Sequence, residues 1–326
     1  MRKIAASLIL FGALATAAWF SLQRMPAVSA TAGSSPTSDS GAGPANLELP
    51  LVSKSTRFAV IGDSGTGDHK QYQVAERMEL YRQKVNYDFV IMLGDNIYGG
   101  HRPDDFKKKF ELPYRALLNA GVKFYASLGN HDDPNYERLY KPFNMNGQRY
   151  YSFKKGDVEF FALDSTYLDP KQLGWIQNSL QKSNAKWKIA YFHHPLYSNG
   201  HMHGPDLDLR AQLTPLFRQY GVNIVFSGHE HVYERVKPAD SIHYFILGNS
   251  GKLMTHDFRS TEGMDKGFDT DQSFMLVEVA DDTLYFQTIS RSGETVDAGS
   301  IRRQSPSNSA ATTGMFLVPV CWRMAH

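Results

Sequence analysis

The 326-residue sequence contains one cysteine, Cys321, and has no marked excess of charge of either sign. A single cysteine excludes a disulfide within the chain and a zinc site built on several cysteines, so any bound metal must take oxygen and nitrogen ligands. Lys and Arg number 35 together and Asp and Glu 33, which leaves a formal net charge of +2. This small balance provides no electrostatic footprint for nucleic acid, and we expect no nucleic-acid partner.

Long hydrophobic runs are also scarce, and the clearest one covers residues 4–20. Arg2 and Lys3 precede it and small residues ending at Ala30 follow it, which is the pattern of an export signal. The run is near the lower length limit for crossing a bilayer, so residues 1–30 are predicted to be a signal peptide or an uncleaved N-terminal anchor. We therefore expect an exported protein, periplasmic or secreted, that is tethered to a membrane only if this segment is retained.

Composition divides the remainder of the chain into three parts. Residues 31–46 are mostly Ser, Gly, Pro and Ala and cannot bury enough apolar surface to offset their ordering entropy, so we predict a flexible linker over 31–54. Residues 304–326 form a C-terminal tail without a recognisable apolar period. Between the linker and the tail, residues 55–303 are predicted to form one folded domain.

Within this domain, short β-rich runs alternate with stretches of helical period. Strands are predicted at residues 58–61, 89–93, 123–128, 158–163, 187–192, 223–226, 242–247, 273–279 and 283–289. Helices are predicted at residues 69–84, 106–119, 170–182 and 207–220. Strands that alternate with helices imply parallel βαβ units, while the closely spaced later strands imply antiparallel pairing. The predicted fold class is therefore α/β (α+β layered), with helices outside the sheets.

Polar side chains follow five of these strands at the point where each strand ends. The segments are Gly62-Asp63-Ser64-Gly65, Gly94-Asp95-Asn96-Ile97-Tyr98, Gly129-Asn130-His131-Asp132, Phe192-His193-His194-Pro195 and Gly228-His229-Glu230-His231. One Gly-Asp pair alone is usually a turn, but ligands of α/β sheets gather at the carboxyl ends of strands. Several buried carboxylates and imidazoles on one edge need a cation to share. The mixed oxygen and nitrogen set suits Fe, Zn or Mn and is poor for calcium.

This ordered set of motifs resembles the calcineurin-like metallophosphoesterases and, among them, the purple acid phosphatases. The wider superfamily has Asp-x-His in its first motif, whereas this chain has Asp63-Ser64-Gly65, and Tyr98 stands three residues after Asp95. A tyrosine there is the distinguishing ligand of the purple acid phosphatases. The resemblance implies a metallophosphoesterase catalytic domain over residues 55–303. Its fold would be a four-layer sandwich of two mixed β-sheets flanked by helices.

The same resemblance implies two metal ions. The ligands would be Asp63, Tyr98 and His231 at the first ion, Asp95 at both ions, and Asn130, His193 and His229 at the second ion. The phenolate of Tyr98 favours Fe(III) at the first site, and Fe(II), Zn(II) or Mn(II) would fill the second. His194 stands beside His193 at a position that varies among similar enzymes.

Three further histidines are candidates for catalysis. His131 would lie close to the phosphate oxygens. Similar enzymes have another histidine about nine residues beyond the strand ligand His193, where this chain has Met202 flanked by His201 and His203. The group that protonates the leaving oxygen is therefore left open among the three histidines.

Two cations about 3.5–4 Å apart can clamp a phosphate and acidify a bound water, so we expect a metal-bound hydroxide to attack the phosphorus in line. An imidazolium donor for the leaving group favours an acidic optimum. The predicted function is an exported dimetal phosphomonoesterase of acid phosphatase type, which hydrolyses small phosphate esters.

Two alternatives remain open. One is a phosphodiesterase or nucleotidase on the same scaffold, which an aromatic cleft around Tyr197 and Tyr233 would favour. The other is an envelope protein that binds the metals without turnover.

Overall fold

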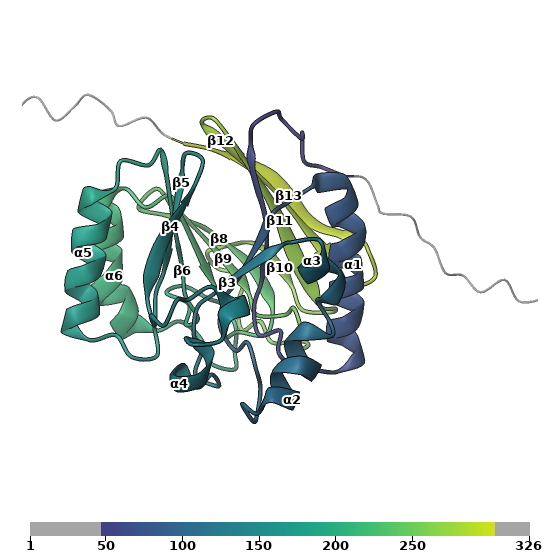
Figure 1. Cartoon of the computed structure of the whole chain (residues 1–326). Helices are drawn as coiled ribbons and strands as arrows, with labels where there is room; N and C mark the ends of the chain where they lie inside the picture. Colours follow the sequence, from purple (N-terminus) through teal and green to yellow (C-terminus); the bar gives the residue numbers. More distant parts are fainter. Residues whose placement is uncertain (1–46, 304–326) are drawn as a thin grey trace, which may run out of the picture. The chain divides into compact units, whose positions relative to one another are not determined.

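The computed structural model describes residues 47–303, and the elements below lie in that range (Figure 1). The predicted signal or anchor segment, residues 31–46 of the linker and the whole predicted C-terminal tail lie outside the described residues. Within 47–303, no helix is both long enough and apolar enough to cross a bilayer.

Six strands form the first sheet, in the order β13-β12-β11-β1-β2-β3. Their bounds are β1 Thr56–Ile61, β2 Phe89–Met92, β3 Lys123–Ala126, β11 Ser273–Ala280, β12 Thr283–Ser290 and β13 Thr295–Arg302. β1 pairs in parallel with β2 and β2 with β3, whereas β11 lies antiparallel to β1, with Phe58 opposite Val277. The sheet is therefore mixed, and its parallel half carries three of the predicted motifs.

Seven strands form the second sheet, in the order β10-β8-β9-β7-β6-β5-β4. Their bounds are β4 Tyr151–Lys155, β5 Val158–Ala162, β6 Trp187–Tyr191, β7 Ile224–Ser227, β8 Tyr233–Ala239, β9 Ile242–Leu247 and β10 Met264–Phe268. Neighbours from β5 to β9 run parallel, and β4, β8 and β10 pair antiparallel. This sheet is also mixed, with its parallel strands in the centre.

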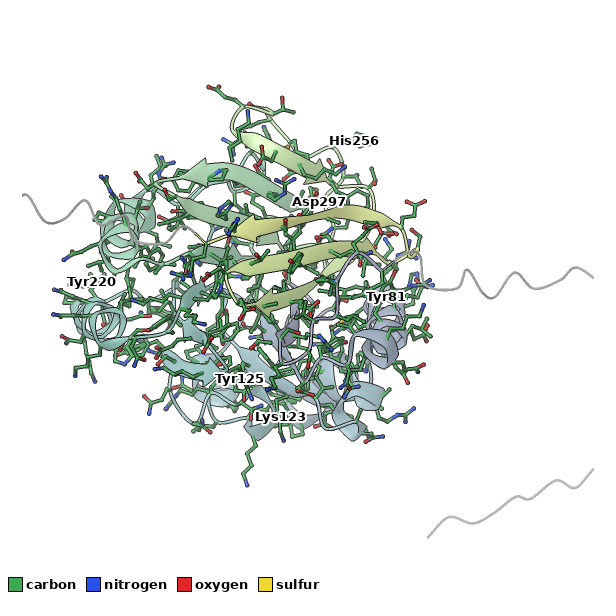
Figure 2. The ribbon with its side chains drawn as sticks, turned by 90° about the horizontal axis from the view of Figure 1, so that it is seen from above. Tyr81, Lys123, Tyr125, Tyr220, His256 and Asp297 are labelled. Atoms are coloured by element: carbon green, nitrogen blue, oxygen red, sulfur yellow. The ribbon has the colours of Figure 1, made fainter. Side chains whose placement is uncertain are left out.

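Helices cover the outer face of each sheet. α1 (His69–Val85) and α3 (Arg115–Asn119) pack on the first sheet, and α5 (Pro170–Lys182) and α6 (Leu207–Tyr220) pack on the second. Seen from above, Tyr81 of α1 and Tyr220 of α6 lie on opposite sides of the sheets (Figure 2). The short helices are α2 (Pro103–Phe106), the π-helical turn η1 (Lys107–Glu111), α4 (Pro134–Glu137) and η2 (Lys141–Phe143).

Successive side chains of a strand point to opposite faces of the sheet, so one strand packs both against the other sheet and against the outer helices. In β1, Phe58 and Val60 pack between the two sheets, while Ala59 and Ile61 pack under the helices of the first sheet. Phe58 stacks on Phe89 with ring centroids 5.3 Å apart. The four layers are helices, sheet, sheet and helices, so the predicted sandwich of two mixed sheets is confirmed.

Some local predictions differ from the structure. The helix predicted over residues 106–119 is divided into α2, η1 and α3. Pro113 lies between η1 and α3, where it has no N–H to continue the helical hydrogen bonds. Residues 47–54, which the sequence assigns to the linker, pack on the domain. Leu49 is buried, and the Leu51 N–H donates to the Glu278 carboxylate at 2.8 Å. Burial of the leucines offsets the ordering entropy that the polar stretch before them cannot.

Candidate dimetal centre

The candidate site lies at the carboxyl ends of the parallel strands of both sheets. Asp63 follows β1, Asp95 follows β2 and Asn130 follows β3 in the first sheet. His193 follows β6 and His229 follows β7 in the second sheet. The two sheets therefore each contribute part of the ligand set, which explains why the candidates are spread over almost 170 residues of sequence.

Glycines next to these residues permit the close approach of the loops. A Cβ added at Gly129 would overlap Asp95 Oδ1, and one added at Gly228 would overlap Asp63 Oδ2. Gly94, with φ +90°, would place a Cβ 2.7 Å from His193 Nδ1. No side chain larger than hydrogen fits at these three positions unless a candidate ligand moves.

Three of the candidate ligands themselves have left-handed backbone. Asp63, Asp95 and His229 have φ values of 53°, 51° and 71°. This conformation is costly for residues other than glycine and is concentrated at functional sites. The surrounding hydrogen bonds hold it in place, since the His229 N–H donates to Asp63 Oδ2 at 2.9 Å and the His131 N–H donates to Asp95 Oδ1 at 3.0 Å.

Asp63, Tyr98 and His231 form the first cluster of candidate ligands. The Tyr98 hydroxyl donates to Asp63 Oδ1 at 3.1 Å and lies 3.3 Å from His231 Nε2. His231 Nε2 lies 3.5 Å from Asp63 Oδ1. The three side chains that the sequence assigns to the first ion are thus brought into mutual contact.

Burial dominates the electrostatics of this first cluster. It raises the pKa of Asp63, with a further rise from the charge of Asp95 that the hydrogen bond from His231 opposes. Burial also raises the pKa of the Tyr98 phenol, as do the charges of Asp63 and Asp95. The pKa of His231 is lowered by burial but raised more by the hydrogen bond and charge of Asp63, so the net shift is upward. Anionic oxygens in so buried a place require a cation, and the donor set fits a hard trivalent or divalent metal ion.

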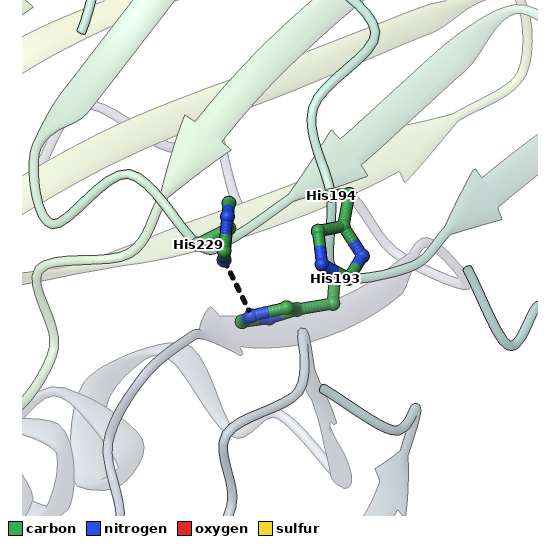
Figure 3. A group of neighbouring side chains, drawn as sticks. All are labelled: His193, His194 and His229. Atoms are coloured by element: carbon green, nitrogen blue, oxygen red, sulfur yellow. Dashed lines mark hydrogen bonds between the residues drawn. The ribbon is translucent and has the colours of Figure 1, made fainter. Parts of the chain in front are cut away.

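The second cluster contains Asp95, Asn130, His193 and His229. His193 Nε2 lies 3.0 Å from Asn130 Oδ1, 3.1 Å from His229 Nδ1 and 3.4 Å from Asp95 Oδ1. His193 Nδ1 is 3.0 Å from the Leu93 carbonyl, which orients the ring. Figure 3 shows the contact of His193 with His229. Burial lowers the pKa of His193, and burial together with His193 lowers the pKa of His229 to about 2. Both imidazoles are therefore neutral at ordinary pH, which is the form that binds a metal.

The two clusters adjoin each other. One ligand atom each from Asp63, Asp95 and His193 lie within 4.8 Å of one another, and the same holds for His193, His194 and His229. Asp95 thus lies between the Asp63 cluster and the histidines, where a carboxylate that bridges two cations belongs. These residues fit two ions in the arrangement that the resemblance implies.

His194 contacts the Ser165 hydroxyl, which competes with a metal ion for one of its ring nitrogens. Its Nδ1 lies 2.8 Å from the Ser165 hydroxyl, while its backbone N–H donates to the same oxygen at 3.1 Å. Its ring is 4.4 Å from that of His229 (Figure 3). One ring nitrogen of His194 is therefore engaged by Ser165, whereas His193 faces Asp95 and Asn130.

The three candidate catalytic histidines occupy different positions. The His131 ring lies 4.9 Å from the Tyr98 ring, and the His203 ring lies 4.1 Å from that of His229 and 6.2 Å from that of His231. For His201, the interactions within residues 47–303 are made by its backbone, whose N–H donates to the Asp257 carbonyl at 2.7 Å. All three histidines are exposed, and the rings of His131 and His203 are the ones that contact candidate ligands.

Sequence reasoning missed the acids that hold the loop bearing His203. Glu230 Oε1 accepts hydrogen bonds from the backbone N–H groups of His203, at 2.8 Å, and Gly204. Asp257 Oδ2 accepts from His201 N–H at 3.2 Å and Met202 N–H at 3.4 Å. The sequence shows a glutamate between two candidate ligands, His229 and His231, and this position was a signal for Glu230. Its hydrogen-bond partners could not be read from the sequence. Together these two carboxylates hold the backbone of residues 201–204 in place.

Lys252 was also missed, and the sequence did not reveal the hydrogen-bond partners of Asp132. Asp132 accepts from the backbone N–H groups of Asn96, Ile97 and Gly129 at 2.8, 3.2 and 2.8 Å, and thereby joins the loops after β2 and β3. Lys252 follows β9, and its Nζ lies 4.5 Å from the centroid of the Tyr98 ring. Because β9 runs parallel to β7, the strand-end rule that found the other candidates also applies to Lys252.

Comparison with known proteins gives the family. A sequence model of the calcineurin-like phosphoesterases matches residues 56–233. The chain is 28% identical over 232 residues to purple acid phosphatase 17 of Arabidopsis thaliana, covering 60% of this chain and 68% of that protein. It is 26% identical over 316 residues to tartrate-resistant acid phosphatase type 5 of Rattus norvegicus, covering 79% and 95%.

A solved structure shares the fold. A purple acid phosphatase from yellow lupin (Lupinus luteus) seeds superposes with a TM-score of 0.65 at 18% identity, covering 83% of this chain and 58% of the lupin chain. The family match spans more than half of the chain and includes all seven candidate metal ligands. The chain therefore belongs to the calcineurin-like phosphoesterase family, with purple acid phosphatases among its relatives, and is a metal-dependent hydrolase of phosphoric ester bonds.

Proposed function

We propose that this protein is an exported acid phosphatase of the purple acid phosphatase type that hydrolyses small phosphate monoesters. The contact of the Tyr98 hydroxyl with Asp63 and His231 carries the proposal, because it places a phenol beside a buried carboxylate and an imidazole. Fe(III) would be held by these three residues and Asp95. The second ion, Fe(II), Zn(II) or Mn(II), would be held by Asp95, Asn130, His193 and His229.

Two cations held by these residues would supply positive charge for the phosphate oxygens and would lower the pKa of a bound water molecule. The surrounding side chains do the rest. His131 lies beside Tyr98, where its imidazole can donate a hydrogen bond to a phosphate oxygen. His203 lies over His229 with its ring partly open to solvent, which suits a group that passes a proton to the leaving oxygen.

The arrangement of tyrosines favours monoesters over larger nucleotide substrates. The hydroxyl of Tyr233, which is buried, donates to Asp297 at 2.6 Å. Tyr197 packs against Tyr244, with ring centroids 4.6 Å apart, and under Arg210. The aromatic cleft that would support a nucleotidase or diesterase is therefore not formed by this pair.

Phosphate release from p-nitrophenyl phosphate and from bis(p-nitrophenyl) phosphate, measured beside elemental analysis of the same metal-loaded protein, tests the proposal. We expect about two metal ions per chain and clear preference for the monoester. Preference for the bis-ester would make the protein a diesterase. Two ions without turnover of either ester would make it a metal-binding envelope protein, and fewer than two ions would contradict the dimetal site.

Export is proposed on the sequence of residues 1–30 alone. Cell fractionation of the full chain, with N-terminal sequencing of the product, tests it. We expect the protein in the exported fraction, with an N-terminus at or near Thr31 if the signal is cleaved. Recovery from the cytoplasm with an intact start would contradict export.

A further inference from the structure

A pocket of about 520 Å³ lies at the edge of the second sheet where β5 ends, the same edge at which His193 follows β6. Three segments form its walls: the region of α4, residues 147–150, and the loop that follows β5. The side chains that give it its chemistry are Arg138, Arg149, Tyr150, Tyr167, Asp169 and Lys171. None of these residues belongs to the ligand set described above.

Two of the walls are attached to segments that carry the centre. Pro134, which lines the pocket, follows Asn130 by four residues, so the chain limits their separation to about 14 Å. Tyr167 follows Ser165 by two residues, and the Ser165 hydroxyl lies 2.8 Å from His194 Nδ1. Short stretches of chain therefore connect the pocket with segments that carry the centre.

The pocket has an excess of positive charge. Arg149 is paired with Asp164 and Asp169, with N–O distances of 3.3 Å for each. Among the residues in 47–303, neither Arg138 nor Lys171 has a carboxylate partner, and Arg138 donates to the Gly147 carbonyl at 2.9 Å. Cations that share a concave surface without a counter-charge attract anions.

The pocket also presents an aromatic face on a fixed backbone. Tyr167 is 57% exposed, yet its N–H donates to the buried Asp164 carboxylate at 3.1 Å and its carbonyl accepts from Gln172 at 3.3 Å. The Arg149 guanidinium lies 5.8 Å from the Tyr167 ring centroid. A large exposed ring on an ordered loop is a common feature of binding surfaces, because little entropy is lost when a ligand covers it.

We propose that this pocket binds a second anionic group of the substrate, and that the enzyme prefers phosphate monoesters whose leaving group joins an aromatic body to a second anion. Arg138 and Lys171 bind the anion, and Tyr167 contacts the aromatic body. This inference rests on the proposed phosphomonoesterase function, since the first phosphate must lie at the dimetal centre.

The test compares substrates that differ only in the second charge. The acids are 4-carboxyphenyl phosphate and 4-(2-carboxyethyl)phenyl phosphate, which differ in the distance between phosphate and carboxylate. Each acid is compared with its primary amide. We expect at least one acid to exceed its amide in kcat/KM by about threefold to tenfold, the effect of one or two partly exposed ion pairs. The preference should shrink as salt is raised.

A double variant assigns the preference to the pocket. In Arg138→Gln/Lys171→Gln, we expect the ratio of acid to amide to fall towards one while kcat/KM for the amides stays within about twofold. The matched control is Arg115→Gln/Lys182→Gln, which removes the same charge from exposed positions on α3 and α5 outside the pocket. It should keep the wild-type ratio. Circular dichroism and thermal midpoints check that both variants fold.

The outcomes separate the pocket from the catalytic proposal. Equal kcat/KM for every acid and amide, with good turnover of all, would overturn the pocket proposal and leave the phosphatase intact. Loss of preference in the control double variant as well would also overturn it. If no ester is hydrolysed, calorimetric binding of the corresponding non-hydrolysable phosphonates still measures the acid-to-amide preference, so the pocket is tested even where the proposed function fails.

Discussion

The His203 ring lies against the His229 ring, with centroids 4.1 Å apart and planes inclined by 30°. This contact exists because Glu230 and Asp257 hold the loop that carries His203 by its backbone N–H groups. His201, two residues earlier, has no such contact with the centre. Because of this ring contact with a candidate ligand, we propose His203 as the group that protonates the leaving oxygen.

His203→Gln is expected to reduce turnover of esters with poor leaving groups far more than turnover of p-nitrophenyl phosphate. An alkoxide needs a proton as it departs, whereas p-nitrophenolate does not, and general acids contribute roughly 10²–10⁴-fold. The measurement is kcat for glycerol 2-phosphate and p-nitrophenyl phosphate. His201→Gln is the matched control and should change both rates by less than about twofold. A larger selective loss in His201→Gln would transfer the role to that residue.

Tyr98→Phe is expected to remove the visible charge-transfer absorption of the iron-loaded protein while the fold is kept. The change deletes the hydroxyl that lies 3.1 Å from Asp63 Oδ1. One lost hydrogen bond costs about 1 kcal/mol, which corresponds to roughly 2–4 °C in thermal midpoint for a domain of this size. Absorption spectroscopy and a thermal scan check both statements. A variant that keeps its colour would show that Tyr98 is not a ligand.

His193→Ala and His194→Ala are expected to differ strongly in metal content. His193 is fully buried among Asp95, Asn130 and His229, whereas His194 Nδ1 is held by the Ser165 hydroxyl. We expect His193→Ala to lose most of the second ion and His194→Ala to keep most of it. Elemental analysis after dialysis against a weak chelator measures this. Equal losses would mean that both rings bind metal.

Gly129→Ala is expected to impair metal binding and destabilise the fold by about 1–3 kcal/mol, the usual cost of overpacking. The added methyl would overlap Asp95 Oδ1 and lie 2.5 Å from the Asp95 nitrogen. Gly174→Ala in α5 is the control, because nothing lies within 4 Å of its added Cβ, and it should stabilise the helix by about 0.5–1 kcal/mol. Urea unfolding of both variants checks the signs. A neutral Gly129→Ala would show that the loops after β2 and β3 can separate freely.

The metal-free protein is expected to lose stability as pH rises from about 5 to 8. Burial raises the pKa of Glu137 from 4.5 to about 8, although hydrogen bonding with Asp132 and the hydrogen bond that the Asn96 amide donates oppose the shift. Because the folded form binds the proton more tightly, the stabilisation is full below pH 4.5 and disappears as pH rises through about 8. This group contributes a slope of at most about 1.4 kcal/mol per pH unit.

Glu137→Gln should flatten that slope, since the amide does not titrate. Urea midpoints at pH 5 and pH 8 measure it, and Glu76→Gln, at an exposed position of α1, is the surface control. Identical slopes in wild type and Glu137→Gln would show that Glu137 is not the source of the pH dependence.

Most of the fold could be predicted from the sequence, and the exceptions have a common cause. The buried central strands were found because they are continuous runs of apolar residues. Three of the four missed strands, β4, β10 and β13, lie at sheet edges, where alternate residues face solvent and the apolar pattern is weak. The division of the helix before β3 was missed because the apolar residues keep a helical period through the segment, although Pro113 interrupts the helical hydrogen bonds between η1 and α3.

For the site, the sequence alone determined which polar residues follow which strands. Because parallel strands have their carboxyl ends on one edge of the sheet, these residues were expected to lie together. That is why Asp63, Asp95, Asn130, His193 and His229 could be grouped before any coordinates. The resemblance already assigns His193 rather than His194 to the second ion, whereas the sequence leaves His201 and His203 equivalent. Only the tertiary structure shows which contacts each of these histidines makes. These contacts are made from distant segments, by Ser165 with one histidine and by Glu230 with the loop of another. Contacts between residues that are tens of positions apart follow from the packing of the two sheets, which no local pattern contains.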